Sequence, residues 1–109
     1  MRLPYRTPYA VVNTDILLPR LLELICDLYE DSQGFLDHTD NAQLWYNRGY
    51  ANGIIHVLRQ LGYARHVANA LELDGPDPIA GQETRPWGQA YRHGWELGQK
   101  ETLKIIETG

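Results

Sequence analysis

The chain contains the same eight-residue pattern twice. Residues 46–53 read YNRGYANG and residues 91–98 read YRHGWELG, so both follow Y-x-[RH]-G-[YW]-x-x-G at a separation of 45 positions. Apolar residues recur at helical spacing around both copies, which predicts that each copy lies inside a helix. A glycine inside a helix costs about 1 kcal/mol relative to alanine, so four such glycines require a compensating gain.

Close approach of two helices would supply that gain. Glycines four positions apart leave a flat strip on one face of a helix, and the neighbouring aromatic residues wall that strip. We therefore expect the two repeat helices to pack strip against strip. Alternatively, one strip stays exposed and receives a partner's helix, a nucleotide or a second copy of the chain, which would give a homodimer. The residues assigned to helix packing are Gly49, Gly53, Gly94, Gly98, Tyr46, Tyr50, Tyr91 and Trp95.

The segment before the first repeat predicts one further helix. Leucine and isoleucine recur at i, i+3, i+4 and i+7 over residues 21–28, which indicates a helix that begins near Pro19 and ends at Gly34. Residues 1–12 contain two prolines, so we expect them to be extended, with a short edge strand possible over residues 9–12. The N-terminal helix would then close the core formed by the repeat helices.

Capping and breaking residues delimit the other helices. Asp40 and Gln43 have the form of a capping box, so the first repeat helix should begin near residue 41 and end at Gly62. A short helix is expected over residues 63–71, followed by a loop over residues 74–85 that is rich in proline and glycine. The second repeat helix should begin at Pro86, because proline is favoured in the first turn of a helix.

Length and composition limit the fold class. The 109 residues suit one hydrophobic core, and 43% hydrophobic with 22% charged residues is ordinary for a globular domain. We predict a single all-α domain spanning residues 1–109, a small bundle of about four helices with an extended N-terminal segment. No apolar run is long enough to span a membrane and no secretion signal is apparent, so we expect a cytoplasmic protein.

The sequence contains no catalytic or cofactor motif. A phosphate-binding loop, a nucleophile elbow, a dinucleotide fingerprint and HExxH are all missing, and the lone Cys26 lies in the apolar stripe of the first helix. We therefore expect a protein without enzymatic activity, cofactor or metal. The weakest alternative is a metal-assisted enzyme that uses Asp37, His38 and Asp40, or His93 with Glu96.

The charge of the chain is unevenly distributed. The net charge is −4, and all of it arises in residues 1–47, where no Lys or Arg lies between Leu21 and Asn47. We name the carboxylates of this region the acidic surface and expect it to bind a protein partner with a basic surface. A solvated face that maintains solubility is the alternative interpretation. The residues of the acidic surface are Glu23, Asp27, Glu30, Asp31, Asp37 and Asp40.

A resemblance suggests a different function. The R-G-Y-x-x-G core of residues 48–53 resembles a helix of the ribosome modulation factor group of small bacterial proteins. That resemblance implies an RNA- or ribosome-associated regulatory factor, with Arg48, Arg92 and the aromatics of the repeat helices as the binding residues. Arginine beside aromatic rings can stack on bases, although the acidic surface would repel a phosphate backbone.

The favoured hypothesis is a small non-enzymatic protein-binding module. Small acidic domains without catalytic motifs are common among phage and mobile-element inhibitors, including anti-CRISPR-like proteins that cover a basic nucleic-acid channel of a host complex. The comparison rests on size, charge and the lack of catalytic motifs, which this chain shares with that class of proteins, and fold by itself does not imply function. RNA binding ranks second and metal-assisted catalysis third.

Overall fold

The computed structural model describes residues 6–71 and 84–108, and the side chains of residues 17–71 and 84–106. It contains four α-helices, and no strand occurs within these ranges, so the predicted all-α bundle is confirmed. None of the described helices is long and apolar enough to cross a membrane. The elements are α1 (Arg6–Asp31), the 3-10 turn η2 (Phe35–Asp37), α2 (Ala42–Gln60), α3 (Ala64–Ala70) and α4 (Pro86–Thr108).

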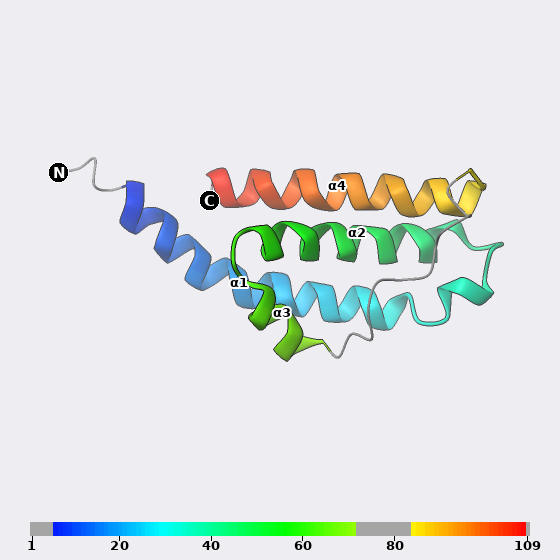
Figure 1. Ribbon diagram of the computed structural model, residues 1–109, viewed down its shortest axis with the longest axis horizontal. Helices are drawn as coiled ribbons and strands as arrows, with labels where there is room; N and C mark the ends of the chain where they lie inside the picture. Colours follow the sequence, from blue (N-terminus) through cyan, green and yellow to red (C-terminus); the bar gives the residue numbers. More distant parts are fainter. Residues whose placement is uncertain (1–5, 72–83, 109) are drawn as a thin grey trace.

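The N-terminal segment differs from its prediction. Helix α1 begins at Arg6, so the expected extended segment and the edge strand over residues 9–12 are wrong from residue 6 onward, and residues 1–5 lie outside the described part. Pro8 occupies the first turn, where backbone N–H groups have no helical partner. Pro19 lies inside the helix with its ring exposed, so water can solvate the carbonyl group that it leaves without a donor. Figure 1 shows α1 changing direction along its length, as an internal proline predicts.

Helix α2 forms the middle of the bundle. Its glycines face α4, whereas Ala51, Ile55 and Leu58 face α1 and α3. Figure 1 shows α4, α2 and α1 as successive layers, with α2 and α4 running in the same direction and α1 running against both. The outer side of α1 and the outer side of α4 therefore point away from each other.

Two clusters of buried side chains hold these layers together. The larger cluster joins α1, α2 and α3, and its fully buried centre includes Ile25, Ile54, Leu58 and Val67. The smaller cluster joins η2 to the beginnings of α2 and α4 through Phe35, Trp45 and Tyr91. The ring centroids of Phe35 and Trp45 are 4.8 Å apart in an edge-on arrangement, and Trp45 Nε1 donates a hydrogen bond to the His38 carbonyl at 3.2 Å.

The boundaries of the other helices follow the sequence prediction, except at one cap. α4 begins at Pro86 as expected, and Gly62, with φ of 95°, follows the end of α2. The expected capping box at the start of α2 is wrong, because Asn41 occupies the cap position and makes no side-chain capping bond. Gln43 instead donates to Asn47 one turn later, at 2.8 Å. Most of the expected loop over residues 74–85 lies outside the described residues.

Candidate functional site

The repeated motif forms the contact between α2 and α4. A methyl group added to Gly49 would overlap the backbone of Tyr91, lying 2.8 Å from its carbonyl carbon, and one added to Gly94 would overlap the Tyr46 carbonyl group and lie 2.9 Å from the Tyr50 nitrogen. Real Cβ atoms essentially never approach other atoms this closely. The packing of strip against strip inferred from the repeat is thus the packing that the structure has.

The contact is reciprocal. Gly53 meets the Trp95 carbonyl group and Gly98 meets the Tyr50 carbonyl group, so each glycine faces the carbonyl of the motif residue three positions before the partner glycine. This pattern relates the two parallel helices by an approximate two-fold axis, and it brings glycine Cα–H groups close to carbonyl oxygens. Because each strip is covered by the other, neither remains for a nucleotide, for a partner's helix or for the proposed homodimer.

Arg48 binds the end of α1 rather than pointing outward. Its Nε donates to the Ser32 hydroxyl at 2.9 Å, and its Nη2 lies 3.4 Å from the carbonyl oxygens of both Tyr29 and Ser32. The guanidinium carbon lies 3.9 Å from the centroid of the Tyr29 ring and 4.9 Å from that of Phe35. A cation at the C-terminus of a helix interacts favourably with its dipole and with its last carbonyl groups. Arg48 therefore joins α2 to α1.

The two arginines named for RNA binding do not share a surface. Arg48 lies between α2 and the end of α1. Arg92 is exposed on the outer side of α4, with its Nε 3.4 Å from Glu96 Oε2. No feature of the sequence indicates the Arg48 contact, because its partner Ser32 is one of several polar residues near the end of α1. Only the structure shows that Ser32 is fully buried, with its hydroxyl donating to the Leu28 carbonyl at 2.6 Å.

A line of polar side chains crosses the three layers. The Tyr29 hydroxyl donates to Asn52 Oδ1, and Asn52 Nδ2 donates to the Tyr91 hydroxyl at 2.7 Å. These bonds satisfy polar groups that would otherwise be costly to bury between α1, α2 and α4. They fix the positions of the three helices relative to one another.

A second tyrosine of the motif bonds across the same helix pair. The Tyr50 hydroxyl donates to the Glu101 carboxylate. Burial of the phenol, and then the bond to Glu101 and its negative charge, raise the pKa of Tyr50 well above its usual value. Tyr50 therefore stays neutral over the ordinary pH range and acts as a hydrogen-bond donor.

The acidic surface lies on the solvent side of the molecule. The six carboxylate residues are all exposed. The four on α1 occupy the side of the helix opposite Leu21 and Ile25, which point into the core. Within the described residues, the ion pair that the structure contains is Arg92–Glu96 on α4, so no described cation neutralises the acidic surface.

Two large apolar side chains lie beside these carboxylates. Leu24 on α1 is 40% exposed and Leu36 in η2 is 39% exposed. Leucine next to exposed carboxylates is suited to contact with a protein, where apolar area adds to charge complementarity. The exposure of Leu24 is not evident from the sequence, because the spacing of this residue places it in the apolar stripe that faces the core.

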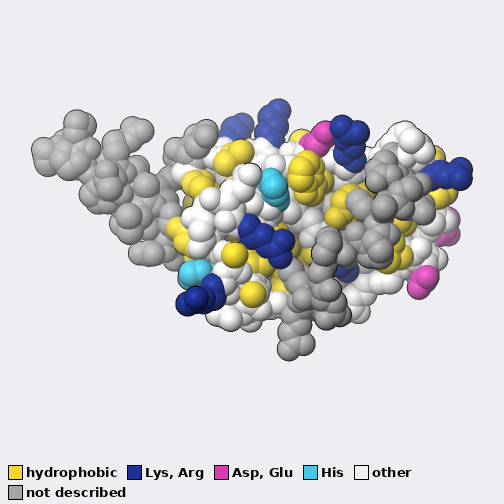
Figure 2. All heavy atoms as spheres, in the orientation of Figure 1, with side chains coloured by type: hydrophobic (Ala, Val, Ile, Leu, Met, Phe, Trp, Pro, Cys, Tyr) yellow, Lys and Arg dark blue, Asp and Glu magenta, His cyan; other side chains and the backbone are white. Residues whose placement is uncertain are grey.

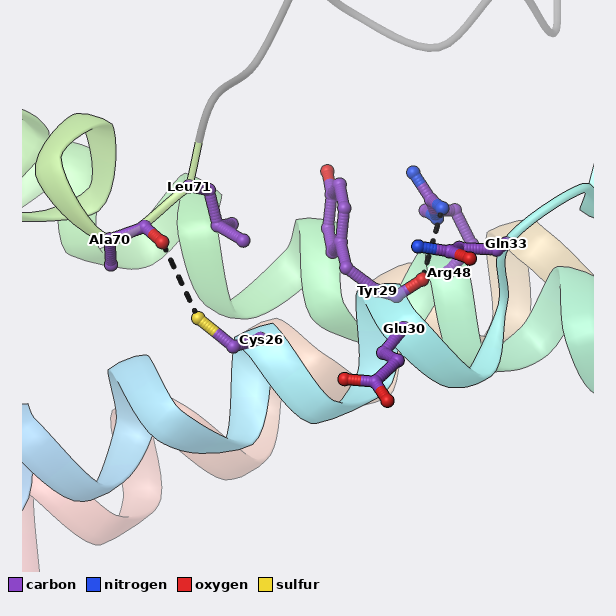
Figure 3. A pocket seen from close by; sticks show the side chains of 7 residues that line it. All are labelled: Cys26, Tyr29, Glu30, Gln33, Arg48, Ala70 and Leu71. Carbon is purple, nitrogen blue, oxygen red and sulfur yellow. Dashed lines mark hydrogen bonds between the residues drawn. The ribbon is translucent and has the colours of Figure 1, made fainter.

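An open hollow borders the acidic surface. It has a volume of about 530 Å³ and lies between α1, α2 and the end of α3. Figure 3 shows the Cys26 thiol directed at the Ala70 carbonyl, and the Glu30 carboxylate pointing away from Arg48. The thiol is half-buried, with its sulfur 3.6 Å from that carbonyl oxygen, so Cys26 packs between α1 and α3.

The structure brings no metal-binding group together in its described part. No three His, Cys, Asp or Glu side chains among those residues lie close enough to hold an ion, and this includes the two combinations considered from the sequence. The ring of His93 instead packs near that of Tyr46 in a tilted arrangement, with ring centroids 5.7 Å apart. Comparison with known protein families, curated proteins and solved structures finds no match for the chain.

Proposed function

We propose that the protein is a non-enzymatic binding module whose acidic surface docks on a basic surface of another protein. One observation carries this proposal: the six carboxylates are all exposed, and no described cation pairs with them. Carboxylates that stabilised the fold would be expected to accept bonds from arginine or from helix N-termini. Four of them instead lie on the half of α1 that approaches its negative C-terminal end, where the helix dipole disfavours them.

The surrounding surface favours a protein as the partner. A phosphate backbone would be repelled by the clustered carboxylates, whereas a surface rich in Lys and Arg would be attracted. Leu24 and Leu36 add exposed apolar area at the same place. Such a module would act by covering the basic surface, as the inhibitor analogy suggests, and its association rate would fall as salt is added.

The test is capture of partners from an extract of the source organism with immobilised protein in three forms. The first is the natural chain, the second is Asp27→Asn/Asp31→Asn, and the third is the control Glu96→Gln/Glu101→Gln. Both variants change the net charge by two at exposed positions, but only Asp27→Asn/Asp31→Asn changes the acidic surface. We expect Asp27→Asn/Asp31→Asn to lose basic proteins that the control retains.

The captured partner is then titrated at increasing salt. Binding that weakens about tenfold or more between about 0.05 M and 0.3 M salt is expected for charge-driven docking. Equal capture by all three forms would contradict the proposal. Retention of structured RNA in a filter-binding assay at moderate salt would favour the ribosome-associated alternative instead.

A further inference from the structure

The outer side of α4 carries positive charge. Arg85, Arg92, Lys100 and Lys104 are exposed, and we name them the basic face. Figure 2 shows Lys and Arg side chains along the edge of the molecule that α4 occupies in Figure 1. The carboxylate of Glu96 lies among them and is paired with Arg92. The apolar side chain of Leu103, 41% exposed, lies on the same side of the helix.

The acidic surface and the basic face are complementary in charge, spacing and direction. The α1 carboxylates of the acidic surface and the basic face of α4 lie on opposite outer layers, with α2 between them, so one molecule cannot bring them together (Figure 1). Asp27 and Asp31 are four residues apart on α1, as Lys100 and Lys104 are on α4. If two copies stack in the same orientation, α1 of one runs antiparallel to α4 of the next, which is also the favourable arrangement of helix dipoles.

We propose that the basic face of α4 is a docking site for the acidic surface of a second copy of this chain. The acidic surface supplies carboxylates and the exposed Leu24 of α1, and the basic face supplies lysine and arginine side chains and the exposed Leu103 of α4. The contact is head-to-tail and does not close on itself, so it forms short chains of molecules rather than a two-fold dimer. This inference uses the same acidic surface as the proposed function, so a second copy and a foreign basic partner would compete for it.

Sedimentation velocity of the purified protein tests the proposal. We expect the weight-average mass to exceed that of the monomer at high protein concentration in about 0.05 M salt, and to return to the monomer value in about 0.5 M salt, where the Debye length falls to a few ångströms. Self-association that persists in about 0.5 M salt would show that charge attraction does not drive the contact, and it would overturn the proposal. A monomer at all concentrations in low salt would overturn the proposal.

A charge-exchange pair separates this mechanism from general stickiness. Lys100→Glu/Lys104→Glu places glutamates opposite Asp27 and Asp31 of the next copy, and Asp27→Lys/Asp31→Lys places lysines opposite Lys100 and Lys104. Each variant alone should associate at least about tenfold more weakly than the natural chain, because like charges then face each other. An equimolar mixture should associate again, with the two variants alternating. Failure of the mixture to associate, with both variants as helical as the natural chain by circular dichroism, would overturn the proposal.

The same variants keep this proposal distinct from the proposed function. Lys100→Glu/Lys104→Glu leaves the acidic surface intact, so it should lose self-association while it still captures a basic partner. Loss of self-association in this variant supports the docking of copies whether or not a foreign partner is captured. Undiminished self-association in this variant would show that α4 is not the docking site.

Discussion

The contact between the two repeated motifs gives the sharpest stability prediction. Gly49→Ala places a methyl group on the backbone of Tyr91, where separations of 2.8 Å and 3.0 Å from its carbonyl carbon and α carbon leave no room. A side chain in the way could change rotamer, but a carbonyl group inside α4 cannot move without the helix. The substitution should therefore push α2 and α4 apart along their whole contact.

Two opposing terms set the size of the effect. Alanine has the better helix propensity, which contributes about 1 kcal/mol in favour of folding. Overpacking a well-packed contact costs about 1–3 kcal/mol. A clash with backbone atoms should cost an amount near the upper end of that range, because the backbone cannot change rotamer. The net loss is about 2 kcal/mol, which lowers the melting temperature of a domain of this size by roughly 8–16 °C.

Thermal and urea unfolding followed by circular dichroism measure this loss. Gln60→Ala, at an exposed position of the same helix, is the control and should change stability by less than about 0.5 kcal/mol. The double variant Gly49→Ala/Gly94→Ala should lose less than the sum of the two single variants, because one separation of the helices accommodates both methyl groups. An unchanged or raised melting temperature in Gly49→Ala would refute the close contact.

Two further predictions concern polar groups. Arg48→Lys keeps the charge but loses the planar fork that reaches Ser32 and Tyr29, so urea unfolding should show a loss of roughly 1–2 kcal/mol, and an unchanged midpoint would argue against the bond to α1. The raised pKa of Tyr50 means that the folded chain holds the phenol proton more tightly than the unfolded chain does. This stabilisation is complete below about pH 10, the usual tyrosine pKa, and is lost as the pH rises above it. Tyr50→Phe should therefore unfold with a weaker dependence on pH between about pH 10 and 12, and equal profiles would contradict the assignment.

The sequence predicted the helix pair but not its direction. A repeat of small residues suits parallel and antiparallel helices equally well. The connection could have decided between them, because residues 61–85 separate α2 from α4 and are long enough to return the chain to the start of α2. An antiparallel neighbour usually needs a much shorter loop. The short helix α3 lies within this return.

Prolines account for the main error in the fold. The predicted boundaries treat Pro8 and Pro19 as residues that a helix interior excludes, yet the first turn of a helix needs no N–H from Pro8, and Pro19 is exposed to solvent. Neither condition can be read from the residue type, because both depend on where the helix begins and on which side the core lies. The exposure of the carboxylates was easier to predict, since α1 keeps its apolar periodicity through residues 21–28.

The differences between the two repeats decide which side of the helix pair α1 covers. The approximate two-fold axis gives α2 and α4 equivalent surfaces, but Arg48 corresponds to His93 and Asn52 corresponds to Leu97. Arg48 donates hydrogen bonds to carbonyl groups at the end of α1, and His93 has no guanidinium group to do the same. Asn52 accepts a hydrogen bond from the Tyr29 hydroxyl, and Leu97 has no amide to accept one. α1 therefore docks on the α2 side, and the outer side of α4 stays uncovered by it. The two differences between the repeats thus place α1 beside α2 and leave α4 on the opposite side, so the acidic layer of α1 is separated from the basic layer of α4.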